Sequence, residues 1–146
     1  MSECDHPARA ARLAMRRGEW TGPTKHAVSG YVQCNLVVLP RADAYDFLVY
    51  CQRNPKPCPL LEVTDPGDPA PHRLAPGADV RTDLSRYVVY RDGQRSEERT
   101  DITDLWRADS VAFLIGSGMS FDDALERAGV TKGQTWLYET EIETEA

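Results

Sequence analysis

The chain has 146 residues and a formal net charge of −6, and hydrophobic residues make up 41% of it. That length suits one ordinary domain, and the apolar content is enough for a core, which excludes a globally disordered chain. No apolar run approaches the roughly 20 residues of a membrane helix, and the negative charge disfavours nucleic-acid binding, which needs a basic face. We therefore expect neither a membrane nor a nucleic-acid partner.

The first predicted element is a surface helix over residues 7–17. Asp5 can cap its start, Pro7 suits its first turn, and Gly18 suits its end. The start of the chain contains no apolar core of a signal peptide. We therefore expect a cytoplasmic protein.

The next elements predict a β-α-β unit. Residues 31–39 are β-branched and mostly apolar, as is typical of a buried strand. The polar exceptions Gln33 and Asn35 share one face, because side chains alternate along a strand. A helix over 42–53 and a second strand just before Asp65 complete the unit and predict a parallel pair, with ligands beyond the carboxyl ends of its strands. We therefore expect Gln33 and Asn35 to lie near Asp65.

The second half of the chain supplies the remaining predicted elements. They are a hairpin over 86–99 with its turn around Asp92-Gly93, a short helix over 101–108, a buried strand over 110–116, a helix over 121–128 between a Ser120 cap and Gly129, and an edge strand over 135–146. The pattern predicts an α/β protein with a mixed sheet.

A proline-rich stretch, residues 51–71, follows the second predicted helix. Its six prolines restrict the backbone, so little entropy is lost when its side chains are ordered. Arg53 and Lys56 could hold a carboxylate. Asp65 could accept a proton, and Cys58 could act as an acid–base group or simply pack. The alternative is a rigid surface loop with solvated charges.

Two further polar groups have both a structural and a functional interpretation. Arg81 and Asp83 can form an ion pair or take part in a site. The turn over residues 115–120 is not a G-x-S-x-G nucleophile elbow, but its main-chain amides could hold an anion at a helix start. Glycines needed for a tight turn are the alternative explanation.

The cysteine spacing favours no metal. The four cysteines contain no C-x-x-C pair, and we expect them to be reduced thiols: Cys4, Cys34, Cys51 and Cys58. None of the three histidines stands at a zinc-ligand spacing from them. No Gly-rich nucleotide loop is evident either. We therefore expect neither a metal nor another cofactor.

Six stretches of the chain resemble one protein family: "TGPT", "GYVQCNLVVLP", "DFLVYCQRNPKPCPLLEVTDPGDP", "APGADVRTDL", "RYVVYRDG" and "TDITDLWRADSVAFLIG". That family is the putative hydro-lyase, or D-glutamate cyclase, family, and the resemblance covers residues 7 to about 130. It implies an α/β protein with a second, smaller α/β domain inserted within the first. For this chain the resemblance implies a partial two-domain architecture, in which residues 1–85 form the first α/β region with the candidate site and residues 86–146 belong to a second or inserted α/β subdomain. It also implies conversion of D-glutamate into 5-oxo-D-proline and water.

Two departures from the family pattern bear on activity. Members of the family are longer, so by resemblance the chain corresponds to an N-terminal half. Where the family has Cys-Ser-Phe-Ser after the "FLIG" strand, this chain has Ser117-Gly118-Met119-Ser120. We therefore expect a chain that is truncated and divergent after about residue 116 and weak or inactive on its own.

The chemistry of this cyclisation suggests roles for the candidate residues. The amine must attack a side-chain carboxyl group whose charge is held by cations, and the leaving oxygen must be protonated. We expect Arg53 with Asn54 to hold a carboxylate, Asp65 to act as the base and Cys58 as the acid. The full set of expected substrate-binding residues is Gln33, Asn35, Gln52, Arg53, Asn54 and Arg81.

Two other interpretations stay open. The chain could be an inactive relative that acts as a binding or oligomerising module. It could also be a thiol redox module, an idea that rests on Cys51 and Cys58. The partner expected for the enzyme is a small carboxylate or amino-acid substrate, and assembly into a homo-oligomer is left open.

Overall fold

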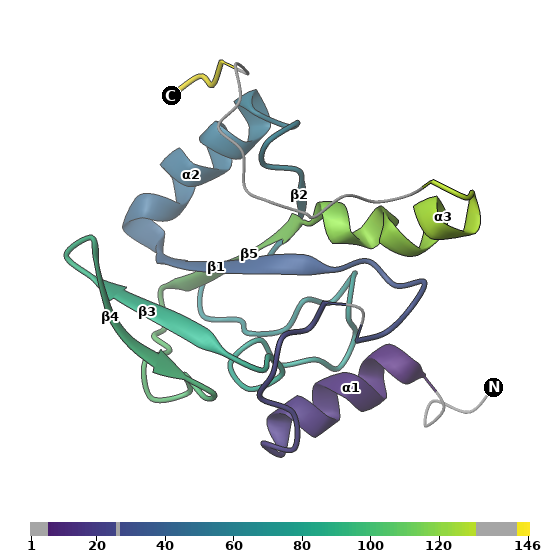
Figure 1. The fold of residues 1–146 in the computed structure, drawn as a ribbon. Coiled ribbons are helices and arrows are strands. Elements are labelled where there is room, and N and C mark those ends of the chain that lie inside the picture. The colour runs from purple at the N-terminus through teal and green to yellow at the C-terminus, as the bar shows by residue number, and fades with distance from the viewer. Residues whose placement is uncertain (1–5, 26, 131–142) are drawn as a thin grey trace.

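The computed structural model describes residues 6–25, 27–130 and 143–146. Figure 1 shows the elements in chain order: α1 (Pro7–Arg16), β1 (Cys34–Pro40), α2 (Arg41–Arg53), β2 (Leu60–Val63), β3 (Tyr87–Arg91), β4 (Gln94–Arg99), β5 (Ser110–Gly116), the 3₁₀ helix η2 (Gly118–Phe121) and α3 (Asp122–Arg127). The chain thus contains both helices and strands, and the predicted α/β class is confirmed.

A three-stranded sheet in the order β1-β5-β2 organises the fold. Both outer strands run antiparallel to β5, and β1 pairs along its whole length, from Cys34 opposite Gly116 to Pro40 opposite Ser110. The chain passes from β1 to β2 through α2, so the predicted β-α-β connection is present. The expected parallel pair is wrong, because β5 comes later in the chain and lies between the two strands.

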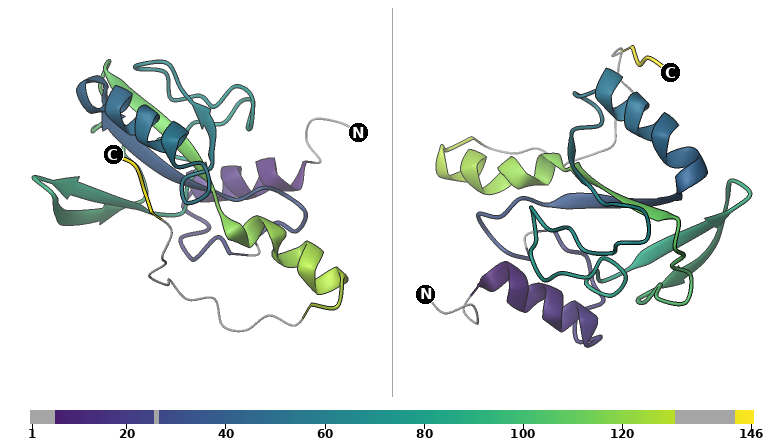
Figure 2. Two further views of the ribbon diagram at one scale, coloured as in Figure 1. Left: turned by 90° about the horizontal axis from the view of Figure 1, so that it is seen from above. Right: turned by 180° about the vertical axis from the view of Figure 1, so that it is seen from behind.

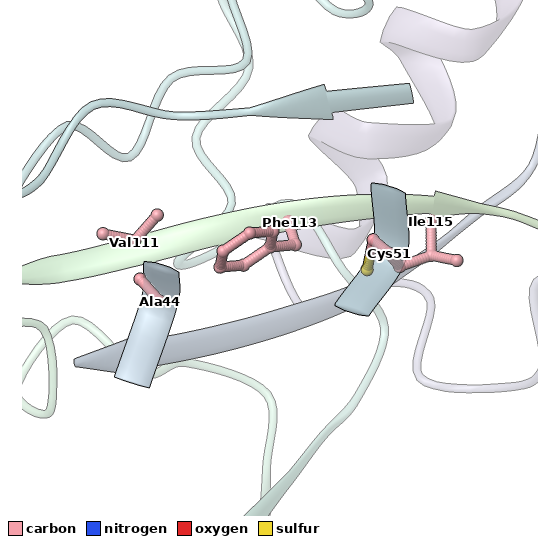
Figure 3. Close-up of a cluster of buried hydrophobic side chains, with 5 residues drawn as sticks. All are labelled: Ala44, Cys51, Val111, Phe113 and Ile115. Atoms are coloured by element: carbon pink, nitrogen blue, oxygen red, sulfur yellow. The ribbon is translucent and has the colours of Figure 1, made fainter. Parts of the chain in front are cut away.

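The helix α2 covers one face of this sheet, because its apolar side chains recur at helical spacing. The buried cluster between them, shown in Figure 3, consists of Ala44, Cys51, Val111, Phe113 and Ile115. Phe113 is 0% exposed, and its ring meets that of Phe47 edge-on at a centroid distance of 4.9 Å. The core therefore sits between α2 and the middle strand.

The opposite face is covered by the long loop between β2 and β3 and by α1 (Figure 2). Two buried carboxylates fasten these segments. Glu62 of β2 accepts hydrogen bonds from the main-chain N–H groups of Arg73 and Leu74, at 2.9 and 2.7 Å. Asp83 of the loop accepts hydrogen bonds from the guanidinium of Arg16, at 2.5 and 2.8 Å. The loop is thereby joined to both the sheet and the first helix.

The strands β3 and β4 form the two-stranded hairpin that the sequence predicts. Its turn has Asp92 at φ 50° and Gly93 at φ 72°. Two successive residues with positive φ are required by the type I′ turn that Asp-Gly favours. Figure 1 shows the hairpin projecting away from the three-stranded sheet.

The helix predicted over residues 101–108 is wrong. This segment forms only a single turn, in which the N–H groups of Leu105 and Trp106 are donated to the oxygen of Ile102. The indole N–H of Trp106 is donated to the oxygen of Gly67 at 3.0 Å. This contact ties the turn to the proline-rich loop.

The predicted Ser120 cap is also wrong. The side chain of Ser117 begins η2 by accepting from the N–H of Met119 at 3.4 Å. Ser120 Oγ instead accepts from the N–H of Gln33 at 2.9 Å and donates to its oxygen at 3.2 Å. Ser120 therefore joins η2 to the residue that precedes β1. The predicted end at Gly129 agrees with its φ of 73°.

Some predictions fall outside the described residues, namely the Asp5 cap and residues 135–142 of the expected edge strand. Within the described ranges no helix is long and apolar enough to cross a membrane. The division into residues 1–85 and 86–146 stays a prediction. The strand β5, which belongs to the second range, lies between two strands of the first.

Candidate functional site

Most of the predicted substrate-binding residues lie at one end of the three-stranded sheet. The strand β1 starts at Cys34 opposite Gly116, and α2 runs back along β1, so its last turn returns to the same end. The strand β2 starts there as well, with Leu60 opposite Ile115. We call this region the Gly116 end, and it comprises residues 33–35, 52–60 and 115–120.

Asn54 is buried at the Gly116 end, with 4% of its surface exposed. Its main-chain N–H and its side-chain Nδ2 are both donated to the oxygen of Tyr50, at 3.0 and 2.8 Å. A carbonyl oxygen can only accept, so the contact with Tyr50 fixes the orientation of the carboxamide. Asn54 is among the predicted residues, whereas Tyr50 is not. The Asn-Pro pair directly after the helical pattern marks a common helix boundary, and this signal could have located the contact with Tyr50.

The Asn54 carboxamide also contacts a main-chain segment that is distant in sequence. Nδ2 donates to the oxygen of Glu145 at 2.7 Å, and Oδ1 accepts from the N–H of Glu145 at 2.8 Å. The guanidinium of Arg53 donates to the main-chain oxygen of Ala146. A donor, an acceptor and a cation therefore stand side by side at the end of α2.

Gln33 contributes a second polar group to the Gly116 end. Its main-chain oxygen accepts from the N–H of Ser117 at 3.0 Å, which fixes it beside η2. Its side-chain Oε1 is buried and has no hydrogen-bond partner among the residues that the structure describes. A buried acceptor of this kind is costly unless a donor reaches it. Gln33 is therefore a candidate to bind a ligand N–H.

Asn35 and Gln52 lie at the same end and are exposed. Asn35 lies two and four positions before Val37 and Leu39 on β1, and those two residues pack in the core under α2. Its side chain therefore belongs to the face of the sheet that α2 covers. Gln52 directly precedes Arg53 on the last turn of α2. Both residues therefore lie at the same end of the sheet as Arg53 and Asn54, and their roles stay predictions.

Most of the main-chain amides that could have held an anion in the turn over residues 115–120 are already bonded. Protein acceptors already bind the N–H groups of Gly116, Ser117, Met119 and Ser120. Their partners are oxygens of the loop before β2, of the residue before β1 and of the turn itself. This turn therefore closes the sheet end and leaves these amides no bond for a substrate oxygen.

Asp65, the expected base, lies at the other end of the sheet. The N–H of Gly67 is donated to the oxygen of Ser110 at 2.8 Å, which places Asp65 beside the first residues of β5. Asn35 pairs near the last residues of β5, so most of that strand, on the order of 13 Å, separates them. The predicted proximity of Gln33 and Asn35 to Asp65 is wrong. A residue at the start of β1 and a residue after the end of β2 lie at opposite ends of strands that point the same way.

Arg81, the expected second cation, is already paired. Its guanidinium donates to both carboxylate oxygens of Asp79, at 2.6 to 3.2 Å. The hydrogen bond to Asp79 raises the pKa of Arg81 above its ordinary value. The predicted pair between Arg81 and Asp83 is wrong, because Asp83 binds Arg16. Both ion pairs hold the loop between β2 and β3.

The cysteines Cys51 and Cys58 pack together in the core under α2. Burial raises the pKa of the Cys51 thiol, and the neighbouring Cys58 raises it further. Burial, followed by the charge of Glu62, also raises the pKa of Cys34. The thiolate is the reactive form of cysteine, so raised pKa values favour packing over redox chemistry at Cys34 and Cys51.

The proline-rich stretch is a packed segment and not a free linker. Leu60 packs against the core, and Gly67 bonds both β5 and Trp106. A depression of about 560 Å³ lies elsewhere, lined by Thr21, Arg86, Glu98, Arg99, Thr100 and Asp101. A site along the proline-rich stretch therefore stays a prediction. Within the described residues no cluster of three or more His, Cys, Asp or Glu side chains could hold a metal ion.

The fold and the Gly116 end define an α/β protein with amide and guanidinium groups gathered at one end of a small sheet. No family model matches the chain. Curated proteins named "putative hydro-lyase" do match it. The protein from Geobacillus kaustophilus is 53% identical over 123 residues, which cover 84% of this chain and 47% of that protein. The protein from Stutzerimonas stutzeri is 55% identical over 121 residues, 83% of this chain and 46% of that protein.

A third relative, from Rubrobacter xylanophilus, is 56% identical over 123 residues, which cover 84% of this chain and 48% of that protein. Identity at this level over most of the chain confirms the resemblance that the motifs indicate. The chain belongs to the family of these hydro-lyase homologues. It spans about half the length of the curated relatives it matches.

Proposed function

We propose that the chain binds D-glutamate at the Gly116 end and belongs to a hydro-lyase that converts it into 5-oxo-D-proline and water. One observation carries this proposal: the buried Asn54 carboxamide presents a donor and an acceptor beside the Arg53 guanidinium. The names of the relatives support the reaction class. The substrate follows from the motif resemblance and from the chemistry of this pair.

An α-amino acid carries the groups that complement this arrangement. Its ammonium can donate to Asn54 Oδ1, where the N–H of Glu145 donates in the structure. Its carboxylate can accept from Asn54 Nδ2 and from Arg53, where two main-chain oxygens accept in the structure. Charge-assisted hydrogen bonds of this kind are shorter and stronger than neutral ones. The site therefore favours a ligand with a positive and a negative group on one carbon.

The proposed reaction joins the two ends of the bound molecule. The amine nitrogen attacks the side-chain carboxyl carbon, a C–N bond forms and a C–O bond breaks. The two protons lost by the ammonium end on the departing oxygen, which leaves as water. Cys58 is a thiol at this end of the sheet, and its N–H is donated to the oxygen of Asn54 at 3.0 Å. It remains the proposed proton donor.

We expect the chain alone to convert D-glutamate slowly. Asp65 is at the far end of the sheet, so the described residues bring no proposed carboxylate base to Arg53. The amides of Ser117, Met119 and Ser120 in the turn after β5 are bonded within the protein. Losing one preorganised oxyanion donor costs on the order of 100-fold in rate, and losing positioning groups costs more.

The proposal predicts that D-glutamate binding depends on Arg53. In isothermal titration calorimetry, Arg53→Ala should bind D-glutamate about 10-fold more weakly, because a charge-assisted bond is lost. Arg95→Ala is the matched control, since that exposed arginine lies on the hairpin. Mass spectrometry of 5-oxoproline measures turnover of D- and L-glutamate in parallel.

Equal affinity of the two variants would contradict the proposed binding site. Fast turnover that Arg53→Ala abolishes would instead show that the chain holds a complete active site. That result would overturn the expectation of weak activity.

A second candidate function is an oligomerising module, and exposed apolar side chains next to the Gly116 end favour it. Val32 is 63% exposed and Phe121 is 66% exposed. They lie on neighbouring segments, because the N–H of Gln33 is donated to Ser120 Oγ. Neighbouring exposed apolar groups are typical of association surfaces.

If a second copy covers these side chains, light scattering after size exclusion should show a dimer for the unaltered chain. Phe121→Ser should shift it to monomer, because the apolar contact is lost. Tyr45→Ser is the control, since Tyr45 is 71% exposed on the outer part of α2. A monomeric unaltered chain would exclude this function.

A further inference from the structure

The segment 143–146 lies against the end of α2, although it is far away in the sequence. Figures 1 and 2 show the C-terminal segment beside the last turn of that helix. Two hydrogen bonds join the Asn54 side chain to Glu145 across 91 positions of sequence. A third contact joins Arg53 to Ala146. Segment 143–146 therefore uses the groups to which the proposed function assigns the ligand.

The contact has the geometry of strand pairing. The N–H and the C=O of one extended residue point to the same side, and here both belong to Glu145. The Asn54 carboxamide offers the matching acceptor and donor, as a main-chain peptide group would. Because Tyr50 holds the carboxamide in place, Asn54 presents this pair of groups before any ligand arrives.

The charges of the two segments also favour the contact between segment 143–146 and the end of α2. Segment 143–146 carries two carboxylates, Glu143 and Glu145. The end of α2 carries Arg53, and Lys56 follows within the next loop. Opposite charges on two segments of one chain raise the population of their contact, although salt screens exposed groups. Tethering further raises the effective concentration of the segment to the millimolar range.

We propose that segment 143–146 is an internal ligand of Arg53 and Asn54 that competes with the amino acid for the same groups. This proposal rests on the proposed function, because it names what regulates that site. Both occupants need Asn54 Oδ1 and Nδ2, so they cannot bind together. Only molecules in which the segment is not bound can take up the free ligand. The apparent affinity is therefore the intrinsic affinity multiplied by the fraction of such molecules.

The variant Glu145→Pro tests the contact, because proline has no N–H to donate to Asn54 Oδ1. Its matched control is Glu143→Pro, which removes the same charge and introduces the same ring. The first readout needs no ligand: the side-chain amide signal of Asn54 in a ¹⁵N–¹H correlation spectrum, assigned by its loss in Asn54→Asp. We expect Glu145→Pro to shift this signal and Glu143→Pro to leave it in place.

The second readout is calorimetric titration with D-glutamate. We expect Glu145→Pro to bind D-glutamate about 10-fold more tightly than the unaltered chain, as expected for a millimolar internal competitor of modest affinity. Glu143→Pro should bind like the unaltered chain. Both results together support the proposal.

Three outcomes would overturn it, and they are distinguishable. An Asn54 signal that Glu145→Pro leaves unchanged would show that the segment does not occupy the site. A shifted signal with equal D-glutamate affinity would show a contact without competition. A shifted signal with no D-glutamate binding in any variant would remove the proposed function, and competition with it, while the contact itself would stand.

Discussion

Replacing Gly67 with alanine should destabilise the fold by about 3–5 kcal/mol. Gly67 has φ +82°, a conformation that costs an L-residue energy. A Cβ at this position would lie 2.8 Å from the main-chain oxygen of Ala108. The backbone would have to shift, and the hydrogen bonds of Gly67 with Ser110 and Trp106 would weaken. The loop would then come away from β5.

Gly77→Ala is the matched control for this experiment. Gly77 has nearly the same φ, +75°, but no atom lies within 4 Å of the position of its Cβ. Gly77→Ala should therefore lower the free energy of unfolding only by the conformational cost of the positive φ, about 1–2 kcal/mol. Urea unfolding followed by tryptophan fluorescence measures both values. Equal losses for the two variants would show that the close approach to Ala108 contributes nothing.

The second large effect is expected for Asp83→Asn. The buried carboxylate of Asp83 accepts from Arg16 Nε and Nη2, from the N–H of Asp79 at 3.0 Å and from Thr82 Oγ1 at 3.1 Å. Asparagine keeps the shape but has one acceptor oxygen and no charge. Arg16 loses the carboxylate that it is hydrogen-bonded to, although its guanidinium is partly solvated. We therefore expect a loss of about 2–3 kcal/mol, less than for a fully buried pair.

The control for Asp83→Asn is Glu19→Gln, which makes the same change in an exposed pair with Arg17. Solvent screens that pair, so its stability should not change measurably. The free energy of unfolding in urea measures both variants. If Asp83→Asn were as stable as Glu19→Gln, α1 would not be fastened to the loop through Asp83.

The sequence predicted local structure better than it predicted distant pairing. The helix ending near Arg53, the hairpin turn at Asp92-Gly93 and the buried strand ending at Gly116 depend on neighbouring residues, and all are present. The place of β5 depends on which strands meet across a long stretch of chain. No local pattern specifies that choice, so the expected parallel pair failed.

The same difference between local and distant information applies to the candidate site. Gln52, Arg53 and Asn54 are neighbours in sequence, so their common location follows once the helix is placed. Asp65 was assigned from its place after the second predicted strand, and Arg81 was assigned from its residue type. Their true positions depend on strand direction and on competing partners, and Arg81 is taken up by Asp79. The contact of Asn54 with Glu145 carries no local signal, because the two are 91 positions apart.

The place of β5 between β1 and β2 also bears on how the protein is made. During synthesis the segments of β1 and β2 leave the ribosome long before the segment of β5, yet neither has a sheet partner until β5 arrives. Their unpaired edges and the apolar face of α2 stay open to other chains in that interval. The growing chain is therefore open to mispairing for longer than one whose neighbouring strands follow each other in sequence.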